Sequence, residues 1–328
     1  MRLGATHIQR GFVMASPLET FLLPFNPAPV RPLKLFGTSE QDVLIGDQLD
    51  DYLYGYAGND LMFGGDGDNQ FFGGSGDDGM YGRDGNNIFN AGSGKDRVVT
   101  GDGDNKANLG SGDDSFQGGT GDNYVKGGSG DDVIEVGVSL LFFSDTIVMP
   151  DGTEQTFFYS YPDEYAGGDN IVFGGSGNDH IVDYAGDSKL WGGTGDDYLD
   201  GGRGNDKLRG GDGHDTMFGG EGRDLMDGGQ GDDTIFAGVG DRVILGGAMG
   251  GADTIRLDLW SDGQEGVIRV FGAQADDTLM LYANQTYERQ QDAIVVTQVI
   301  GDEVTEVRLV GIGADTMLIE YVDTTGKG

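Results

Sequence analysis

Aspartate recurs every 18 residues through much of this 328-residue chain. The first series is Asp42, Asp60, Asp78, Asp96, Asp114 and Asp132. The second series is Asp179, Asp197, Asp215 and Asp233, continued by Asp253 after a two-residue slip. A hard divalent cation takes about six to eight oxygen ligands and gains affinity from their charge. A lone aspartate in a glycine-rich turn is ordinarily a hydrogen-bonded turn former, but a phased row of carboxylates predicts a column of Ca²⁺ sites.

Another set of polar residues lies nine residues out of phase with these aspartates. In the first half of the chain it comprises Asp51, Asn69, Asn87, Asn105 and Asn123, and in the second half Asn170, Ser188, Asp206, Asp224 and Arg242. We predict an added calcium site between Asp206 and Asp224. The asparagines predict either a neutral side-chain ladder or a row of weaker sites. Arg242 cannot ligate a cation, so we expect it to end its column.

A nine-residue repeat, G-G-x-G-x-D-x-U-x with U a large apolar residue, supplies the elements that position these side chains. It runs over 37–135 as eleven nonapeptides and over 165–245 as nine more, and the aspartates and asparagines occupy its sixth place. The eighth place is apolar throughout: Leu44, Leu53, Met62, Phe71, Met80, Phe89, Val98, Ala107, Phe116, Val125, Ile134, Val172, Ile181, Leu190, Leu199, Leu208, Met217, Met226, Ile235 and Ile244. One inward residue in nine fits a turn of about six residues and a strand of about three. Two units form one coil of 18 residues, so we expect an all-β roll of stacked parallel strands in two runs.

Glycine and proline support this interpretation. We expect glycine at the first, second and fourth places because the backbone there needs positive φ and close approach. Proline cannot donate to a strand ladder and should be excluded from it. Five of the seven prolines precede residue 37, and Pro150 and Pro162 lie between the runs.

These motifs resemble those of the RTX (hemolysin-type calcium-binding) family over about 190 of the 328 residues. The resemblance implies a right-handed parallel β-roll with calcium held between turns by the sixth-place aspartates and by backbone carbonyls. Those carbonyls would include Gly74, Gly76, Gly92, Gly94, Gly110, Gly112, Gly128 and Gly130. It also implies type I secretion through an uncleaved C-terminal signal. The asparagine series departs from the family's usual aspartate.

The charge supports a large complement of cations. The chain has 56 acidic and 20 basic residues and a formal charge of −36. One ion per stacked turn pair would give about sixteen dications, which nearly cancel this charge. We therefore expect the metal-free chain to be disordered and to fold only outside the cell, where calcium is plentiful.

Other features of the composition limit the kinds of site, the membrane association and the partners that we expect. There is no cysteine, so a disulfide framework and a zinc–thiolate site are excluded. No apolar stretch is long enough to be a transmembrane segment, and the first residues lack the apolar core of a secretory signal. The negative charge argues against nucleic acid as a partner.

Three segments lie outside the two predicted runs of the roll, which we place at 37–135 and 165–256. Residues 1–36 read as an irregular arm that caps the first coil. Residues 136–164 read as a β-hairpin insertion whose aromatics either cover the roll or form a binding patch for glycan or membrane; they are Phe142, Phe143, Phe157, Phe158, Tyr159 and Tyr161. Residues 257–328 alternate between apolar and polar, and we expect an antiparallel β cap with a possible secretion signal.

Little in the sequence indicates catalysis. There is no H-E-x-x-H motif, and His7, His180 and His214 are far apart. We therefore expect no enzyme, but a secreted calcium-binding protein that acts as an extracellular structural or adhesive component at a cell surface. The alternative is a calcium-dependent carbohydrate-binding module, similar to the repeat modules of alginate epimerases, with an extracellular polysaccharide as its partner.

Overall fold

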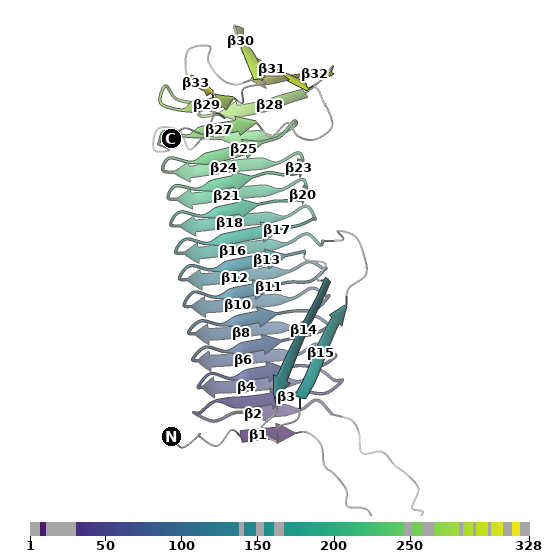
Figure 1. The fold of residues 1–328 in the computed structure, drawn as a ribbon. Helices are drawn as coiled ribbons and strands as arrows, with labels where there is room; N and C mark the ends of the chain where they lie inside the picture. The colour runs from purple at the N-terminus through teal and green to yellow at the C-terminus, as the bar shows by residue number, and fades with distance from the viewer. Residues whose placement is uncertain are drawn as a thin grey trace, which may run out of the picture.

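The computed structural model describes residues 7–10, 31–137, 141–148, 154–160, 167–245, 251–257, 266–281, 285–290, 293–300, 303–310 and 317–321. These residues form an elongated roll in which short strands stack one above another from β2 near the N-terminus to β33 (Figure 1). The described part of the chain contains strands and turns and no helix. The expected all-β parallel roll is confirmed.

Two sheets, whose strands are parallel except at the C-terminal end of the second, form the walls of the roll. The first sheet contains, in spatial order, β1 (His7–Arg10), β3 (Asp42–Ile45), β5 (Leu61–Phe63), β7 (Gly79–Tyr81), β9 (Arg97–Val99), β11 (Ser115–Gln117), β13 (Val133–Val136), β17 (His180–Asp183), β19 (Tyr198–Asp200), β22 (Thr216–Phe218), β25 (Thr234–Ala237), β27 (Thr254–Leu257), β29 (Thr278–Leu281) and β33 (Leu318–Tyr321). The second sheet contains β2 (Lys34–Phe36), β4 (Tyr52–Ala57), β6 (Gln70–Ser75), β8 (Ile88–Ser93), β10 (Lys106–Ser111), β12 (Tyr124–Ser129), β16 (Ile171–Ser176), β18 (Lys189–Thr194), β21 (Lys207–Asp212), β24 (Leu225–Gln230), β26 (Arg242–Ile244), β28 (Gly266–Phe271), β32 (Glu303–Val310), β31 (Ala293–Ile300) and β30 (Gln285–Gln290).

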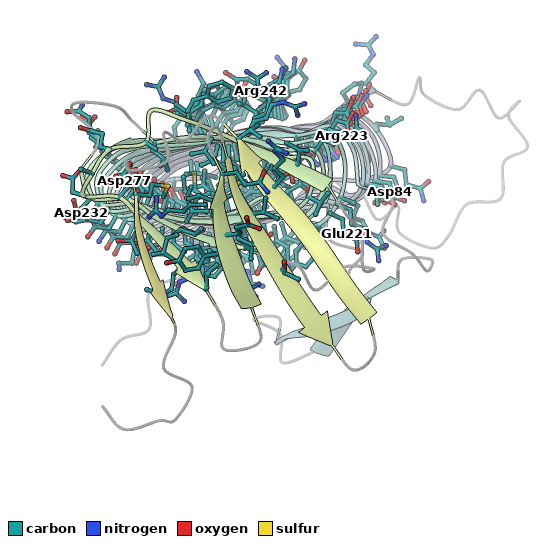
Figure 2. The ribbon with its side chains drawn as sticks, turned by 90° about the horizontal axis from the view of Figure 1, so that it is seen from above. Asp84, Glu221, Arg223, Asp232, Arg242 and Asp277 are labelled. Carbon is teal, nitrogen blue, oxygen red and sulfur yellow. The ribbon has the colours of Figure 1, made fainter. Side chains whose placement is uncertain are left out.

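The sheets are joined by turns at two opposite edges. Seen from above, Asp232 and Asp277 lie at one end of the flattened cross-section, and Asp84 and Arg223 lie at the other end (Figure 2). We call the edge that carries the sixth-place aspartates Asp42 to Asp277 the aspartate edge. We call the opposite edge the mixed edge, and its residues Asn69, Asn87, Asn105, Asn123 and Asn170 the asparagine stretch.

The two runs of repeats form one continuous roll. Strand β12 pairs in parallel with β16, with Tyr124 opposite Ile171, although 47 residues separate these two partners. Strands β13 and β17 pair in the same way, with Val133 opposite His180. The residues between the runs therefore leave the stack after β13, and the stack resumes without loss of register.

The expected hairpin between the runs is present. Strand β14 (Leu141–Val148) pairs antiparallel with β15 (Glu154–Ser160). The side chains of this hairpin lie outside the described residues, as does Tyr161, so its aromatics remain a prediction.

The ends of the roll differ in part from expectation. Parallel stacking continues well beyond residue 257, because β27, β29 and β33 pair in parallel, as do β26, β28 and β32. Among the described strands at this end, β31 pairs antiparallel with both β30 and β32. Alternation has the same period of two in both kinds of sheet, so the sequence could not separate them. At the other end, β1 and β2 pair with β3 and β4, so the arm contributes strands to the roll.

The core is one continuous cluster of apolar side chains that both sheets contribute. All of the predicted eighth-place residues from Leu44 to Ile235 are buried. The prediction for the last of these positions, Ile244, was wrong. Val243 is the buried residue of that strand, and Ile244 is only half-buried. The turn Gly238-Val239-Gly240 is one residue shorter than the template, which shifts the following strand by one place. Two additional short strands, β20 (Arg203–Gly204) and β23 (Glu221–Gly222), pair along the mixed edge.

Candidate metal centre

One oxygen of each sixth-place aspartate holds the stack together. The backbone N–H of Asp78 donates to Oδ1 of Asp96 at 2.8 Å, and Asp96 donates to Asp114 in the same way. The ladder crosses the insertion, since the N–H of Asp132 donates to Oδ1 of Asp179 at 2.9 Å. It continues through Asp253 to Asp277, which the sequence analysis did not identify. The aspartate edge is thus one uninterrupted column.

The second oxygen of most of these carboxylates has no hydrogen-bond partner in the part of the chain that the structure describes. These buried Oδ2 atoms belong to Asp60, Asp78, Asp96, Asp114, Asp132, Asp179, Asp197, Asp215 and Asp233 on the aspartate edge and to Asp206 and Asp224 on the mixed edge. A buried carboxylate oxygen without a partner is strongly unfavourable unless it binds a cation or is protonated.

Both ends of the column on the aspartate edge are closed by the protein itself. Oδ2 of Asp42 accepts the backbone N–H and the hydroxyl of Thr38 at 2.5 and 2.9 Å. At the far end, Oδ2 of Asp277 accepts the N–H of Gln274 at 2.6 Å. Asp42 was predicted to bind calcium. Here its outer oxygen already has two donors, in contrast to the carboxylates inside the column.

Burial sets the protonation of the inner carboxylates in the metal-free roll. Desolvation, opposed by the backbone hydrogen bonds, raises the pKa of Asp78, Asp132, Asp197 and Asp233 to about 7. The same cause raises the pKa of Asp96, Asp114, Asp179, Asp215 and Asp224 to about 6 and that of Asp206 to about 8. Neighbouring carboxylates add to the shift at Asp78 and Asp206. These groups resist ionisation unless a positive charge accompanies them.

The glycine turns bring the backbone of successive coils into close contact beside the free oxygens. Gly92 and Gly94, at the second and fourth places, have φ of +123° and +125°. A Cβ on either would lie about 2 Å from the carbonyl oxygen of Gly74 or Gly76 in the preceding coil. The first-place Gly73 differs from our expectation, because its φ is not positive. Glycine is suited to this place because there is no room for a side chain. A Cβ there would lie 2.5 Å from Oδ2 of Asp78.

The mixed edge carries the same backbone ladder with different side chains. The N–H of Asn69 donates to Oδ1 of Asn87 at 2.9 Å, and that of Ser188 donates to Oδ1 of Asp206 at 2.7 Å. The ladder ends at Asp241, whose Oδ1 accepts the N–H of Asp224. The prediction that Arg242 ends the column was therefore wrong by one place, owing to the same short turn that displaced Ile244.

Asparagine adds donors where aspartate has a free oxygen. Nδ2 of Asn87 donates to the carbonyls of Arg83 and Gly85 at 3.1 and 3.0 Å. Nδ2 of Asn123 donates to the carbonyls of Gly119 and Gly121 at 3.3 and 3.0 Å. These acceptors occupy the second and fourth places of the turn, as do the carbonyls that the resemblance assigned to calcium.

The donor set of the aspartate edge fits calcium. The turns from Asp60 to Asp233 each present one unpaired carboxylate oxygen close to backbone carbonyls, and oxygen ligands of this kind are those that Ca²⁺ prefers. Nowhere in the described ranges do three histidine, cysteine or acidic side chains form a cluster that could hold a metal ion. A site here would therefore combine successive coils, with one carboxylate from each and carbonyls for the remaining ligands.

An outer ladder at the fifth place was missed. The N–H of Lys95 donates to Oδ1 of Asp77 at 2.8 Å, and that of Asp122 donates to Oδ1 of Asp104 at 2.9 Å. Even His214 takes part, since its Nδ1 accepts the N–H of Asp232. The recurrence of Asp and Asn at the fifth place, also at a spacing of 18, was a signal that the sequence contained.

The comparisons agree with this geometry. The family model of the RTX calcium-binding nonapeptide repeat matches residues 36–71, 45–80, 72–107, 108–138, 166–181, 173–208 and 209–244. No curated protein matches the chain. Within the residues that the structure describes, no helix is long and apolar enough to span a membrane.

Two solved structures are similar in part. The AlgE6R3 subunit from the Azotobacter vinelandii mannuronan C5-epimerase is 23% identical, with a TM-score of 0.25, over 43% of this chain and 83% of that one. The extracellular lipase LipA from Serratia marcescens is 17% identical, with a TM-score of 0.18, over 89% of this chain and 40% of that one. At these TM-scores neither overlay extends an activity to this chain. The family model, by contrast, matches more than half of its residues, and the chain belongs to the RTX calcium-binding repeat family.

Proposed function

We propose that this protein is a secreted β-roll that folds when it binds calcium and then acts as an extracellular structural or adhesive component. The observation that carries the proposal is the set of eleven buried aspartate oxygens without a partner. They are a structural feature of the whole roll, which points to metal as part of its scaffold.

Electrostatics makes the fold dependent on that metal. Adjacent strands lie about 4.8 Å apart, so successive carboxylates of the aspartate edge are close neighbours. At an effective dielectric constant of about 20, two like charges at this distance repel by roughly 3 kcal/mol. The chain's formal charge of −36 adds long-range repulsion. Calcium removes both costs, and secretion would bring the chain into a calcium-rich medium before it folds.

The outer faces favour a rigid structural role. Aromatic rings stack along the roll, as in Phe36–Tyr54–Phe72, with centroids 5.2 and 4.7 Å apart. Phe218 and Phe236 stack at 4.1 Å on the other sheet. Since ring faces contact each other, the ladders stabilise stacking and present mainly their edges to solvent.

His180 and His214 also have structural contacts. His180 stacks on Tyr198 with centroids 4.5 Å apart and ring planes 4° apart. His214 accepts a backbone hydrogen bond in the outer ladder. We propose that the chain is not an enzyme, in keeping with these contacts.

A second candidate function is calcium-dependent polysaccharide binding. An open groove on the second sheet is lined by Trp191, Arg209, Asp212, Asp227 and Gln230. Trp191 stacks on Phe173 at 4.5 Å, and Arg209 lies 3.7 Å from Asp227. An aromatic ring beside a guanidinium and carboxylates is suited to sugar hydroxyls and uronate groups.

Binding assays with the calcium-loaded chain separate the two functions. The structural proposal predicts calcium-dependent self-assembly or attachment to cells, seen by light scattering and by cell-coating assays, which Trp191→Ala leaves unchanged. Retention of acidic polysaccharide that Trp191→Ala abolishes, while the matched Phe236→Ala on the other sheet retains it, would favour the module instead. A calcium-loaded chain that neither assembles nor coats cells would contradict the structural role.

A further inference from the structure

We propose that the asparagine stretch of the mixed edge binds no calcium, because the amide nitrogen of each asparagine takes the position of the cation. The inference rests on the proposed function only in that calcium holds the aspartate edge. It makes the first half of the roll one-sided, with metal along one edge and a closed network of amides along the other.

The hydrogen bonds of the backbone ladder determine the orientation of each asparagine amide group. Oδ1 of Asn105 accepts the N–H of Asn87 at 3.0 Å, and Oδ1 of Asn123 accepts the N–H of Asn105 at 3.3 Å. The corresponding aspartate oxygens accept the same bonds on the aspartate edge. Nδ2 of the asparagine is therefore the counterpart of the unpaired Oδ2 of the aspartate, one atom for one atom.

The amide then satisfies the acceptors that a cation would otherwise use. Nδ2 of Asn69 donates to the carbonyls of Gly65 and Gly67 at 3.3 and 3.1 Å. Nδ2 of Asn105 donates to those of Gly101 and Gly103 at 3.3 and 2.8 Å. An amide N–H carries partial positive charge, so it neutralises these carbonyls without an ion. A dication at the same place would face donors, and the neutral side chain adds no charge to attract it.

The network also runs from coil to coil and closes on a carboxylate. Nδ2 of Asn105 lies 3.2 Å from Oδ1 of Asn123, whose own Nδ2 lies 3.1 Å from Oδ1 of Asn170. Nδ2 of Asn170 then donates to Oδ2 of Asp183 at 3.2 Å. The other oxygen of Asp183 accepts the N–H of Ala185 at 3.1 Å. In the described part of this edge, the next coils change character, because Oδ2 of Asp206 and of Asp224 is again buried without a partner.

The count of ions distinguishes this arrangement from a uniformly loaded roll. One ion between each pair of successive unpaired carboxylates gives about nine, eight on the aspartate edge and one between Asp206 and Asp224, against the sixteen of a roll in which every stacked turn pair holds one. The difference falls mainly on the asparagine stretch. Calcium on the mixed edge begins only where the aspartates resume.

Native mass spectrometry of the full-length, calcium-saturated chain tests the inference directly. The double variant Asn87→Asp with Asn105→Asp places two carboxylates in successive coils, and we expect it to gain one or two ions. The matched variant Asn87→Ser with Asn105→Ser should keep the wild-type count, since Ser188 fills the sixth place naturally. Loss of ions from the serine variant would overturn the inference.

Anomalous diffraction from wild-type crystals grown in calcium gives a second answer that needs no variant to fold. We expect peaks along the aspartate edge and beside Asp206 and Asp224, and none beside the asparagine stretch. Peaks beside both edges throughout would overturn the inference and leave the proposed function intact. A wild-type chain that binds no calcium on either edge would overturn the proposed function itself.

Discussion

The aspartate edge and the asparagine stretch perform the same structural task with one atom exchanged. In both, Oδ1 of a sixth-place residue accepts the backbone N–H of the preceding coil, at 2.8 Å from Asp96 to Asp114 and 2.9 Å from Asn69 to Asn87. In both, the glycine turn surrounds the remaining side-chain atom. Where that atom is Nδ2 the turn is complete, and where it is Oδ2 a positive charge is missing. The turn therefore needs positive charge at that place, and either an amide N–H group or a cation can supply it.

Acid should substitute for calcium at the buried aspartates and not in the asparagine stretch, and this is the largest effect we expect. Burial raises the pKa of the inner aspartates from 3.8 to about 6 to 8, so between these values the folded chain binds more protons than the unfolded one. Stability of the metal-free roll then falls as pH rises through that range. In chelator, far-UV circular dichroism should show β-structure increasing from pH 8 to pH 5. A flat profile would show that the buried carboxylates are not what destabilises the metal-free chain.

Single alanine substitutions should separate the edges by their calcium dependence. Asp114→Ala removes a ligand and leaves the neighbouring charges under-compensated, with an expected loss of about 3–5 kcal/mol in calcium. Asn105→Ala leaves carbonyls and one N–H unpaired, a loss of about 1–3 kcal/mol. Only Asp114→Ala should also raise the calcium midpoint of folding, measured by urea unfolding across a calcium series. Equal shifts of the midpoint in both variants would contradict the distinction.

Transplanting the amide should make an aspartate turn independent of metal. In Asp114→Asn the new Nδ2 can reach the carbonyls of Gly110 and Gly112, as its counterparts do on the mixed edge. We expect the metal-free chain to gain about 1–3 kcal/mol per site, because a buried charge is exchanged for satisfied hydrogen bonds. The calcium-loaded chain should hold fewer ions. Urea unfolding in chelator measures the gain, and a less stable metal-free variant would show that the two turns are not equivalent.

The outer ladder should be indifferent to the edge, with the smallest effect. Oδ1 of Asp104, on the mixed edge, accepts the N–H of Asp122 at 2.9 Å, and Oδ1 of Asp131, on the aspartate edge, accepts that of Asn178 at 2.8 Å. Alanine at either should cost about 0.5–1.5 kcal/mol in calcium-saturated thermal or urea unfolding. A much larger loss at Asp131 than at Asp104 would extend the metal's influence to the fifth place.

The sequence contained the columns and the core, because a side chain's place in a nine-residue unit determines both its edge and its direction. The positions of Asp78 in its column and of Phe89 in the core follow from the repeat alone. Two kinds of information were absent. A shortened turn, as before Asp241, moves every later side chain by one place, and only the pairing of Met226 with Val243 reveals it. The direction of an amide, as at Asn87, depends on which neighbour accepts and which donates.

The strand arrangement at the C-terminal end shows a further limit. The alternating segments there include both parallel partners of the roll and the antiparallel β30, β31 and β32. Alternation reports which side chains face the core and carries no record of strand direction. Whether a strand pairs parallel or antiparallel depends on how the connecting segment returns the chain to the sheet.

The most direct test of the central claim is a calcium titration of the chelated, full-length chain followed by far-UV circular dichroism at neutral pH. We predict a cooperative transition from a disordered spectrum to a β spectrum that chelator reverses. A chain that already gives the full β spectrum in chelator, and does not change as calcium is added, would contradict the account. The unpaired oxygens of the aspartate edge would then be tolerated without metal.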